Sequence, residues 1–209
     1  ENAWLKSIRD IDNKLKQKNS TPAFLHFEDG TKFKGLVNRP SDDKEMTAGI
    51  WGEAAFTTGM TGYEETITDP SFLGQHIIFT HSHIGNYEAN AQVRQAERSF
   101  ATCVIARHFS ANSFLDSLPI PLFSGVDTRS LVRYLVGKKT CTHKSVLTFS
   151  AQTPSASEFA KANLNTDDLS LVSQKGKITH RPGSNPIVIM NYGMKQAILD
   201  HLMSLNFPL

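Results

Sequence analysis

The sequence predicts a mixed α/β protein, because strand-like and helix-like patterns alternate along its 209 residues. Apolar and polar residues alternate with period two over residues 24–37, on both sides of Asp29-Gly30, a dipeptide that favours a tight hairpin. Residues 128–136 have helical spacing and follow Asp127, a favourable N-cap. Together these patterns predict strands packed with one or two helices in a compact β/β/α arrangement.

The first 60 residues are expected to form a helix, a hairpin, a loop and a strand. Apolar residues recur every three or four positions over residues 2–18, which predicts an amphipathic helix. This helix could dock on the main domain or bind a partner. After the hairpin, the polar residues 39–48 are expected to form an exposed loop, and residues 50–57 a strand.

Residues 59–86 combine turn residues with a strand. Gly59 and Gly62 suit a tight turn, and Asp69-Pro70-Ser71 predicts a surface loop of defined geometry, because proline fixes φ and its neighbours can bond to the backbone. Residues 76–80 are expected to form a strand, which residues 83–86 end as a turn.

The elements expected after residue 99 alternate in the same way. Residues 100–107 and 145–149 are expected to be strands, the latter closing the domain, whereas residues 108–124, with two prolines, leave their helix content open. The helix after Asp127 is expected to end at Gly137 as a glycine C-cap. A short helix over 154–163 and a linker over 174–186 should follow, then a buried parallel strand over 187–191, Gly193 and a helix to about residue 205.

The composition is that of a globular protein without a polyanion partner. Lys and Arg total 22 against 20 Asp and Glu, and the signs are interspersed, so we expect no nucleic-acid partner and no anionic membrane surface. No apolar run approaches a membrane span and no signal-peptide pattern begins the chain, which predicts a soluble, cytoplasmic protein. Because the chain starts at Glu1 and stops soon after a strand-helix pattern, we expect a fragment or a cleaved piece.

The residues that most often carry chemistry are here expected to be structural. Cys103 lies in an apolar run, and neither it nor Cys141 is in a CxxC motif, so no catalytic cysteine is expected. His81-Ser82-His83 lacks the neighbouring ligands of a metal site and the context of a nucleophile, and His83 is expected to hydrogen-bond within the turn. The single Gly193 is too little for a dinucleotide fingerprint.

Five blocks of sequence, in order, resemble a known family. They are FEDGTKFKG (27–35), GEAAFTTG (52–59), MTGYEETITDPSFLGQ (60–75) with HIGN (83–86), GVDTRSLVRYL (125–135) and VIMNYGMKQAIL (188–199). The chain is thereby identified as similar to the N-terminal domain of the small, glutamine-hydrolysing subunits of carbamoyl phosphate synthases. The sequence departs from that family at Ala54-Ala55, at His81-Ser82 and in the shortened 108–124 segment.

The resemblance implies a division of the chain. Residues 1–21 would be an N-terminal helix, 22–150 the small-subunit N-terminal domain, 151–186 a short helix and linker, and 187–209 the first β-α unit of a class I glutamine amidotransferase domain. The family's catalytic Cys, His and Glu would lie beyond these residues, so the chain alone is expected to be inactive.

The same resemblance implies a function and partners. The small subunit releases ammonia from glutamine, and a large subunit, which would hold ATP and metal, uses it to make carbamoyl phosphate for arginine or pyrimidine synthesis. No cofactor is expected in this chain. Ser71, positioned by Asp69 and Pro70, would help to bind glutamine. The alternative is a non-catalytic interaction or regulatory module on the same scaffold; a Gly-rich Cys elbow and a distal His-Pro-Glu string would favour the enzyme.

Overall fold

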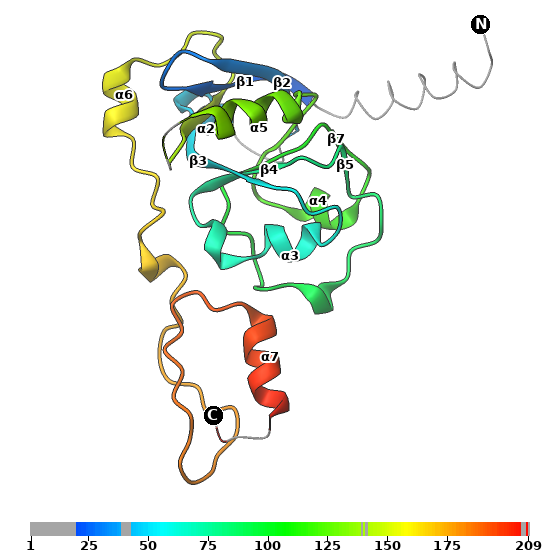
Figure 1. Cartoon of the computed structure of the whole chain (residues 1–209), viewed down its shortest axis with the longest axis vertical. Helices are drawn as coiled ribbons and strands as arrows, with labels where there is room; N and C mark the ends of the chain where they lie inside the picture. Colours follow the sequence, from blue (N-terminus) through cyan, green and yellow to red (C-terminus); the bar gives the residue numbers. More distant parts are fainter. Residues whose placement is uncertain (1–19, 39–42, 139, 141, 206–207, 209) are drawn as a thin grey trace, which may run out of the picture.

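The computed structural model describes residues 20–38, 43–138, 140, 142–205 and 208. The helix expected over 2–18 lies outside them. The central feature is a closed barrel of seven strands in the order β1-β2-β8-β6-β4-β3-β9 (Figure 1). Its strands are β1 (Ser20–Phe27), β2 (Lys32–Asn38), β3 (Ile50–Thr57), β4 (Gln75–Phe79), β6 (Cys103–Ile105), β8 (Leu122–Ser124) and β9 (Lys144–Thr148). The mixed α/β class is therefore confirmed.

The first and last strands of the barrel pair antiparallel with their neighbours. β1 and β2 form the expected hairpin, with Gly30 at a φ of 85° in its turn. β9 pairs with β1 on one side and with β3 on the other, so the expected closing strand joins the first strand of the barrel to the third.

The other half of the barrel is parallel. β3, β4, β6 and β8 all run in one direction, so their carboxyl ends meet at the same edge of the sheet. The connections between them carry α3 (Tyr63–Ile67) and α4 (Ser113–Ser117). They also carry β5 (His83–Ile84) and β7 (His108–Phe109), which pair in parallel as a separate two-stranded sheet.

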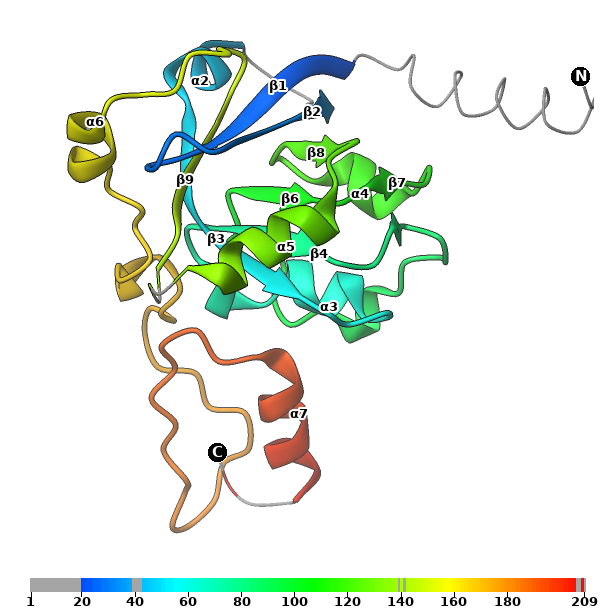
Figure 2. The same ribbon diagram turned by 45° about the horizontal axis from the view of Figure 1, so that its top comes forward.

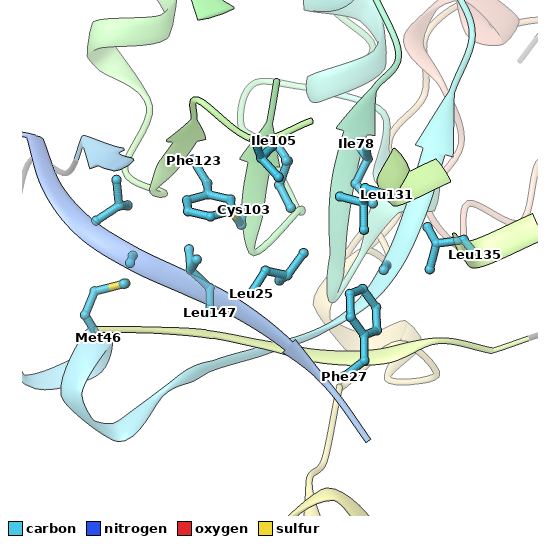
Figure 3. Close-up of a cluster of buried hydrophobic side chains, with 14 residues drawn as sticks. Leu25, Phe27, Met46, Ile78, Cys103, Ile105, Phe123, Leu131, Leu135 and Leu147 are labelled. Carbon is cyan, nitrogen blue, oxygen red and sulfur yellow. The ribbon is translucent and has the colours of Figure 1, made fainter. Parts of the chain in front are cut away.

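Two apolar clusters hold the barrel, one on each face of the parallel strands. The inner cluster contains Leu25, Ile78, Ile105, Phe123 and Leu147 (Figure 3). Helix α2 (Asp43–Ala48) adds Met46 to it, and α5 (Thr128–Gly137) adds Leu131 and Leu135.

The outer cluster lies under α3 and α4. Ile77 and Val104 belong to it, whereas Ile78, Cys103 and Ile105 belong to the inner cluster, which is the period-two alternation of a strand buried on both faces. Tyr63 and Ile67 of α3 and Phe114 of α4 cover these residues.

Three expectations about local structure are wrong. Residues 43–48 form α2 rather than an exposed loop, because Met46 enters the core. Residues 83–84 form β5 rather than only a turn, since β7 offers a partner. Asp127 caps α5 as expected by accepting from the Ser130 amide, but Gly137 is the last helical residue and not a left-handed C-cap.

The C-terminal segment differs most from expectation. The short helix is confirmed as α6 (Ala156–Lys161). It begins with a capping box formed by Ser155 and Glu158, and its Phe159 packs against Trp51. Beyond it, α7 (Gln196–Ser204) is confirmed and lies below the barrel in both views (Figures 1 and 2). Residues 187–191 form no strand, and Val188 is 79% exposed. A buried parallel strand needs strands on both sides, whereas the described chain supplies only isolated backbone bonds, from Gln174 to Asn191 and from Ile187 to Pro208.

The described residues include no helix that is long and apolar enough to cross a membrane.

Candidate functional site: the junction at the Asp69-Pro70-Ser71 turn

The Asp69-Pro70-Ser71 segment forms a tight turn after α3. Asp69 is 5% exposed and caps the 3₁₀ helix Pro70–Phe72; its Oδ1 accepts a hydrogen bond of 3.0 Å from the Ser71 amide. Pro70 occupies the first helical position, where its missing N–H costs nothing. The sequence predicted a surface loop of defined geometry with Asp69 bonded to nearby backbone; that bond is present, but Asp69 and Pro70 are buried and only Ser71 is exposed.

The hydroxyl is the donor that Ser71 can still offer to a ligand. Its side chain is exposed, and its amide is already bonded to Asp69. Within the described residues the Ser71 hydroxyl makes no hydrogen bond. The turn therefore presents one hydroxyl that can donate or accept.

The turn lies against the segment that leads into α7. Gly193 has a φ of 96°, and a Cβ there would stand 3.4 Å from the Pro70 Cβ, so the two backbones approach closely. Lys195 Nζ lies 2.7 Å from Asp69 Oδ2, with the Asp69 side chain 7% exposed. One carboxylate thus orders the Ser71 turn with one oxygen and binds the start of α7 with the other.

Gln95 completes this junction from the loop that follows β5. Its backbone O accepts a 3.0 Å hydrogen bond from the Gln196 amide, and its Oε1 accepts one of 3.2 Å from the Ala197 amide. Both are first-turn amides of α7 that have no partner inside the helix. Because Lys195, the N-cap residue, makes no side-chain cap bond, Gln95 caps α7 from outside it.

α3 fixes the position of Gln95. Thr68 Oγ1 accepts from the Gln95 amide at 2.9 Å and donates to the Glu64 carbonyl at 2.8 Å. The buried Glu64 carboxylate pairs with Arg94 Nε at 2.6 Å and accepts from the Asn90 amide at 2.7 Å. The junction is therefore built on two buried carboxylates, Glu64 and Asp69, each paired with a cation that is partly exposed.

The other chemistry-bearing residues lie elsewhere. Cys103 is fully buried in the inner cluster, where burial raises the pKa of its thiol far above the ordinary value, as the interpretation of a buried thiol requires. Cys141 lies outside the described residues. His83 bonds to Ser82 Oγ at 2.9 Å, the expected contact within its turn. Among the residues that the structure describes, no group of three or more His, Cys, Asp or Glu could hold a metal ion.

Gln95 and Lys195 belong to the junction, but sequence reasoning missed both. A single glutamine in a polar run carries no signal for capping a helix that begins a hundred residues later. Lys195 lies within the recognised block at residues 188–199, but its partner Asp69 was assigned only to the turn.

Comparison with known proteins places the barrel in a family. Residues 25–145 match the family model described as carbamoyl-phosphate synthase small chain, CPSase domain. The chain belongs to this family. The matched residues run from β1 to β9, so they include nearly the whole barrel and the Ser71 turn.

Similarity to carbamoyl-phosphate synthase small chains extends beyond the barrel. The small chain of Caldanaerobacter subterraneus subsp. tengcongensis is 34% identical over 199 residues, covering 89% of this chain and 51% of that protein. The arginine-specific small chain of Halalkalibacterium halodurans is 31% identical, with 87% and 51% covered, and the small chain of Listeria monocytogenes is 32% identical, with 89% and 53% covered. The chain spans about half the length of the curated relatives it matches.

Proposed function

We propose that this chain is the N-terminal part of a glutamine-hydrolysing small subunit, which supplies ammonia to a large subunit for carbamoyl phosphate synthesis. In this proposal the barrel is the structural and partner-binding domain, and Ser71 contacts glutamine across the junction. The family membership of residues 25–145 supports the first part. The contact of the Ser71 turn with Gly193 and Lys195 carries the second, because it brings an unbonded hydroxyl to the segment expected to begin the amidotransferase domain.

The geometry favours the Ser71 hydroxyl over its amide as the group that contacts glutamine. Asp69 already uses the amide, so a Ser71→Ala variant removes the group that remains. A hydrogen bond to a charged group of glutamine contributes about 1.5–3 kcal/mol. Because glutamine makes this bond in both the ground state and the transition state, its loss raises KM with little change in kcat.

The test uses a small subunit that carries this chain together with a complete amidotransferase domain. Ser71→Ala is expected to raise the KM for glutamine about tenfold or more and leave kcat within about twofold. The matched control is Ser170→Ala, because Ser170 is an exposed serine of another 3₁₀ helix, Leu169–Leu171. This substitution should leave both KM and kcat unchanged. A Ser71→Phe subunit that folds, assembles and keeps the wild-type KM would contradict the assignment.

Partner binding is tested separately. Stable interfaces bury about 1,200–2,000 Å², so the chain of 209 residues, added in excess, is expected to compete with the complete small subunit for the large subunit. Failure to compete would contradict the partner-binding role without affecting the assignment of Ser71. The chain by itself should release no ammonia from glutamine above a no-enzyme control, because Cys103 is buried in the barrel.

A further inference from the structure

A polar cleft opens where the parallel strands of the barrel end. Its volume is about 820 Å³. Thr80, His81 and Ser82 line it directly after β4, Arg107 soon after β6, and residues 125–129 directly after β8. The cleft therefore lies at the carboxyl ends of three neighbouring parallel strands, which is where α/β sheets and barrels most often bind ligands.

The sheet formed by β5 and β7 supplies the remaining wall. His83 and His108 pair across it, and their rings lie edge to face with centroids 5.4 Å apart. His83 Nδ1 is bonded to Ser82 Oγ, whereas its Nε2 makes no hydrogen bond within the described residues. Together with His81, three imidazoles line one cleft.

Two arginines line the cleft without a direct side-chain contact in the described part of the chain, although the charge of Arg107 acts on Asp127 from a distance. Arg107 and Arg129 are both exposed, and in the described part of the chain neither guanidinium makes a hydrogen bond or an ion pair. Arginine presents planar, forked N–H donors that match the oxygens of a phosphate group. Donors of this kind, placed together at a ligand-binding edge, form a site for an anion.

Among the described residues that line the cleft, Asp127 is the only carboxylate, and its oxygens already accept hydrogen bonds. Asp127 Oδ1 accepts from the Ser130 amide at 3.1 Å, and Oδ2 accepts from the Ser130 hydroxyl at 2.8 Å. These bonds, with the nearby Arg107 charge, keep the pKa of Asp127 below its ordinary value, so it stays ionised and caps α5. The helix N-terminus is thus occupied, and the side chains of the cleft remain as the donors.

We propose that this cleft binds the phosphate group of a small phosphorylated molecule, with Arg107 and Arg129 as its principal ligands. The volume falls within the range of about 300–1,000 Å³ that small-molecule sites occupy, and it exceeds what a bare phosphate would fill. A mononucleotide-sized phosphomonoester fits both the charge and the size. The cleft shares no residue with the junction around Ser71, so it forms a second site of the domain.

The test titrates the chain of 209 residues with AMP, with inorganic phosphate and with adenosine, following binding by calorimetry. AMP is expected to bind, phosphate to bind more weakly, and the uncharged nucleoside not to bind. The affinity for AMP should fall as the salt concentration rises, because the contacts are exposed and ionic. Replacing both arginines by alanine should weaken AMP binding about a hundredfold, or about tenfold for each guanidinium.

Arg133→Ala is the matched control, because Arg133 is an exposed arginine of the same helix α5 and does not line the cleft. Its affinity for AMP should stay within about twofold of the wild-type value. AMP binding that the double variant retains would overturn the proposal. An absence of any AMP or phosphate binding would also overturn it. If the double variant then failed to bind the large subunit, the cleft would instead be a contact site for an acidic surface of that subunit.

Discussion

His76 is a titratable residue in the wall of the barrel. It is fully buried, its Nδ1 lies 2.8 Å from Ser145 Oγ, and Ser145 in turn donates to the Gly52 carbonyl, so it connects β4, β9 and β3. Burial lowers its pKa from 6.5 to about 4, against a smaller opposing effect of the Ile50 backbone. The folded protein therefore holds His76 neutral at pH values where an unfolded chain would protonate it.

The stability of the fold should fall in acid because of this residue. The neutral ring stabilises the folded state above pH 6.5, and that contribution is lost as the pH falls towards 4, by up to about 3 kcal/mol. Denaturant unfolding at pH 7, 6, 5 and 4 should show a shallower pH dependence for His76→Gln than for the wild type. The exposed His180→Gln is the control and should keep the wild-type slope.

Gly74 gives a second prediction at this scale. Its φ is 69°, and a Cβ there would collide with the backbone carbonyl of Leu164. Gly74→Ala should lower the free energy of unfolding by about 3 kcal/mol or more. Gly30→Ala, at a φ of 85° with nothing within 4 Å, isolates the backbone penalty and should cost about 1 kcal/mol. Equal losses in thermal or chemical unfolding would show that Leu164 does not constrain this position.

Among the elements, α7 depends on a cap from another part of the chain. Gln95→Ala removes one of the two acceptors of its first amides, a loss of about 1 kcal/mol. Hydrogen exchange of residues 196–204 should accelerate about fivefold, whereas the barrel strands should keep wild-type rates. The control is Gln92→Ala, because Gln92 is an exposed glutamine of the same loop. It should leave the exchange rates of both α7 and the barrel strands unchanged. Uniform acceleration across the barrel would argue against a local capping role.

The helices and strands that the sequence predicted correctly are those whose structure is decided by nearby residues. The Asp29-Gly30 hairpin and the α5 N-cap are fixed by residues within a few positions of one another, and both were predicted. Helix α2 was missed because Met46 is the single large apolar side chain of its run, and a partner far away in sequence buries it.

The apolar run at 187–191 was misassigned for the opposite reason. Its pattern suits a buried strand, but such a strand forms only where neighbouring strands are present. The Ser71 turn was predicted from local residues together with a family resemblance. The ion pair of this turn with Lys195, and the bonds of Gln95 to Thr68 and α7, required the fold, because no spacing in the sequence marks which residue meets which.

In the molecule as a whole, the apolar packing that stabilises the fold lies in the barrel. The buried members of both apolar clusters lie between residues 23 and 135, with Leu147 in addition, and α7 contributes no buried residue. A variant that ends at residue 172 should therefore unfold at a midpoint within about 3 °C of the complete chain. Leu147→Ala in the inner cluster should instead cost about 2–5 kcal/mol. A large drop in the midpoint of the shortened variant would show that the C-terminal segment supports the barrel.

The pairing of β9 with β1 also governs how the protein can be made. On the ribosome, β1 is synthesised more than a hundred residues before the strand that covers its free edge. At 5–20 residues per second this interval lasts on the order of ten seconds. Throughout that time the hairpin of β1 and β2 has an open edge that another nascent chain could join. The free edge of β1 is therefore covered only when β9 has been synthesised and has paired with it.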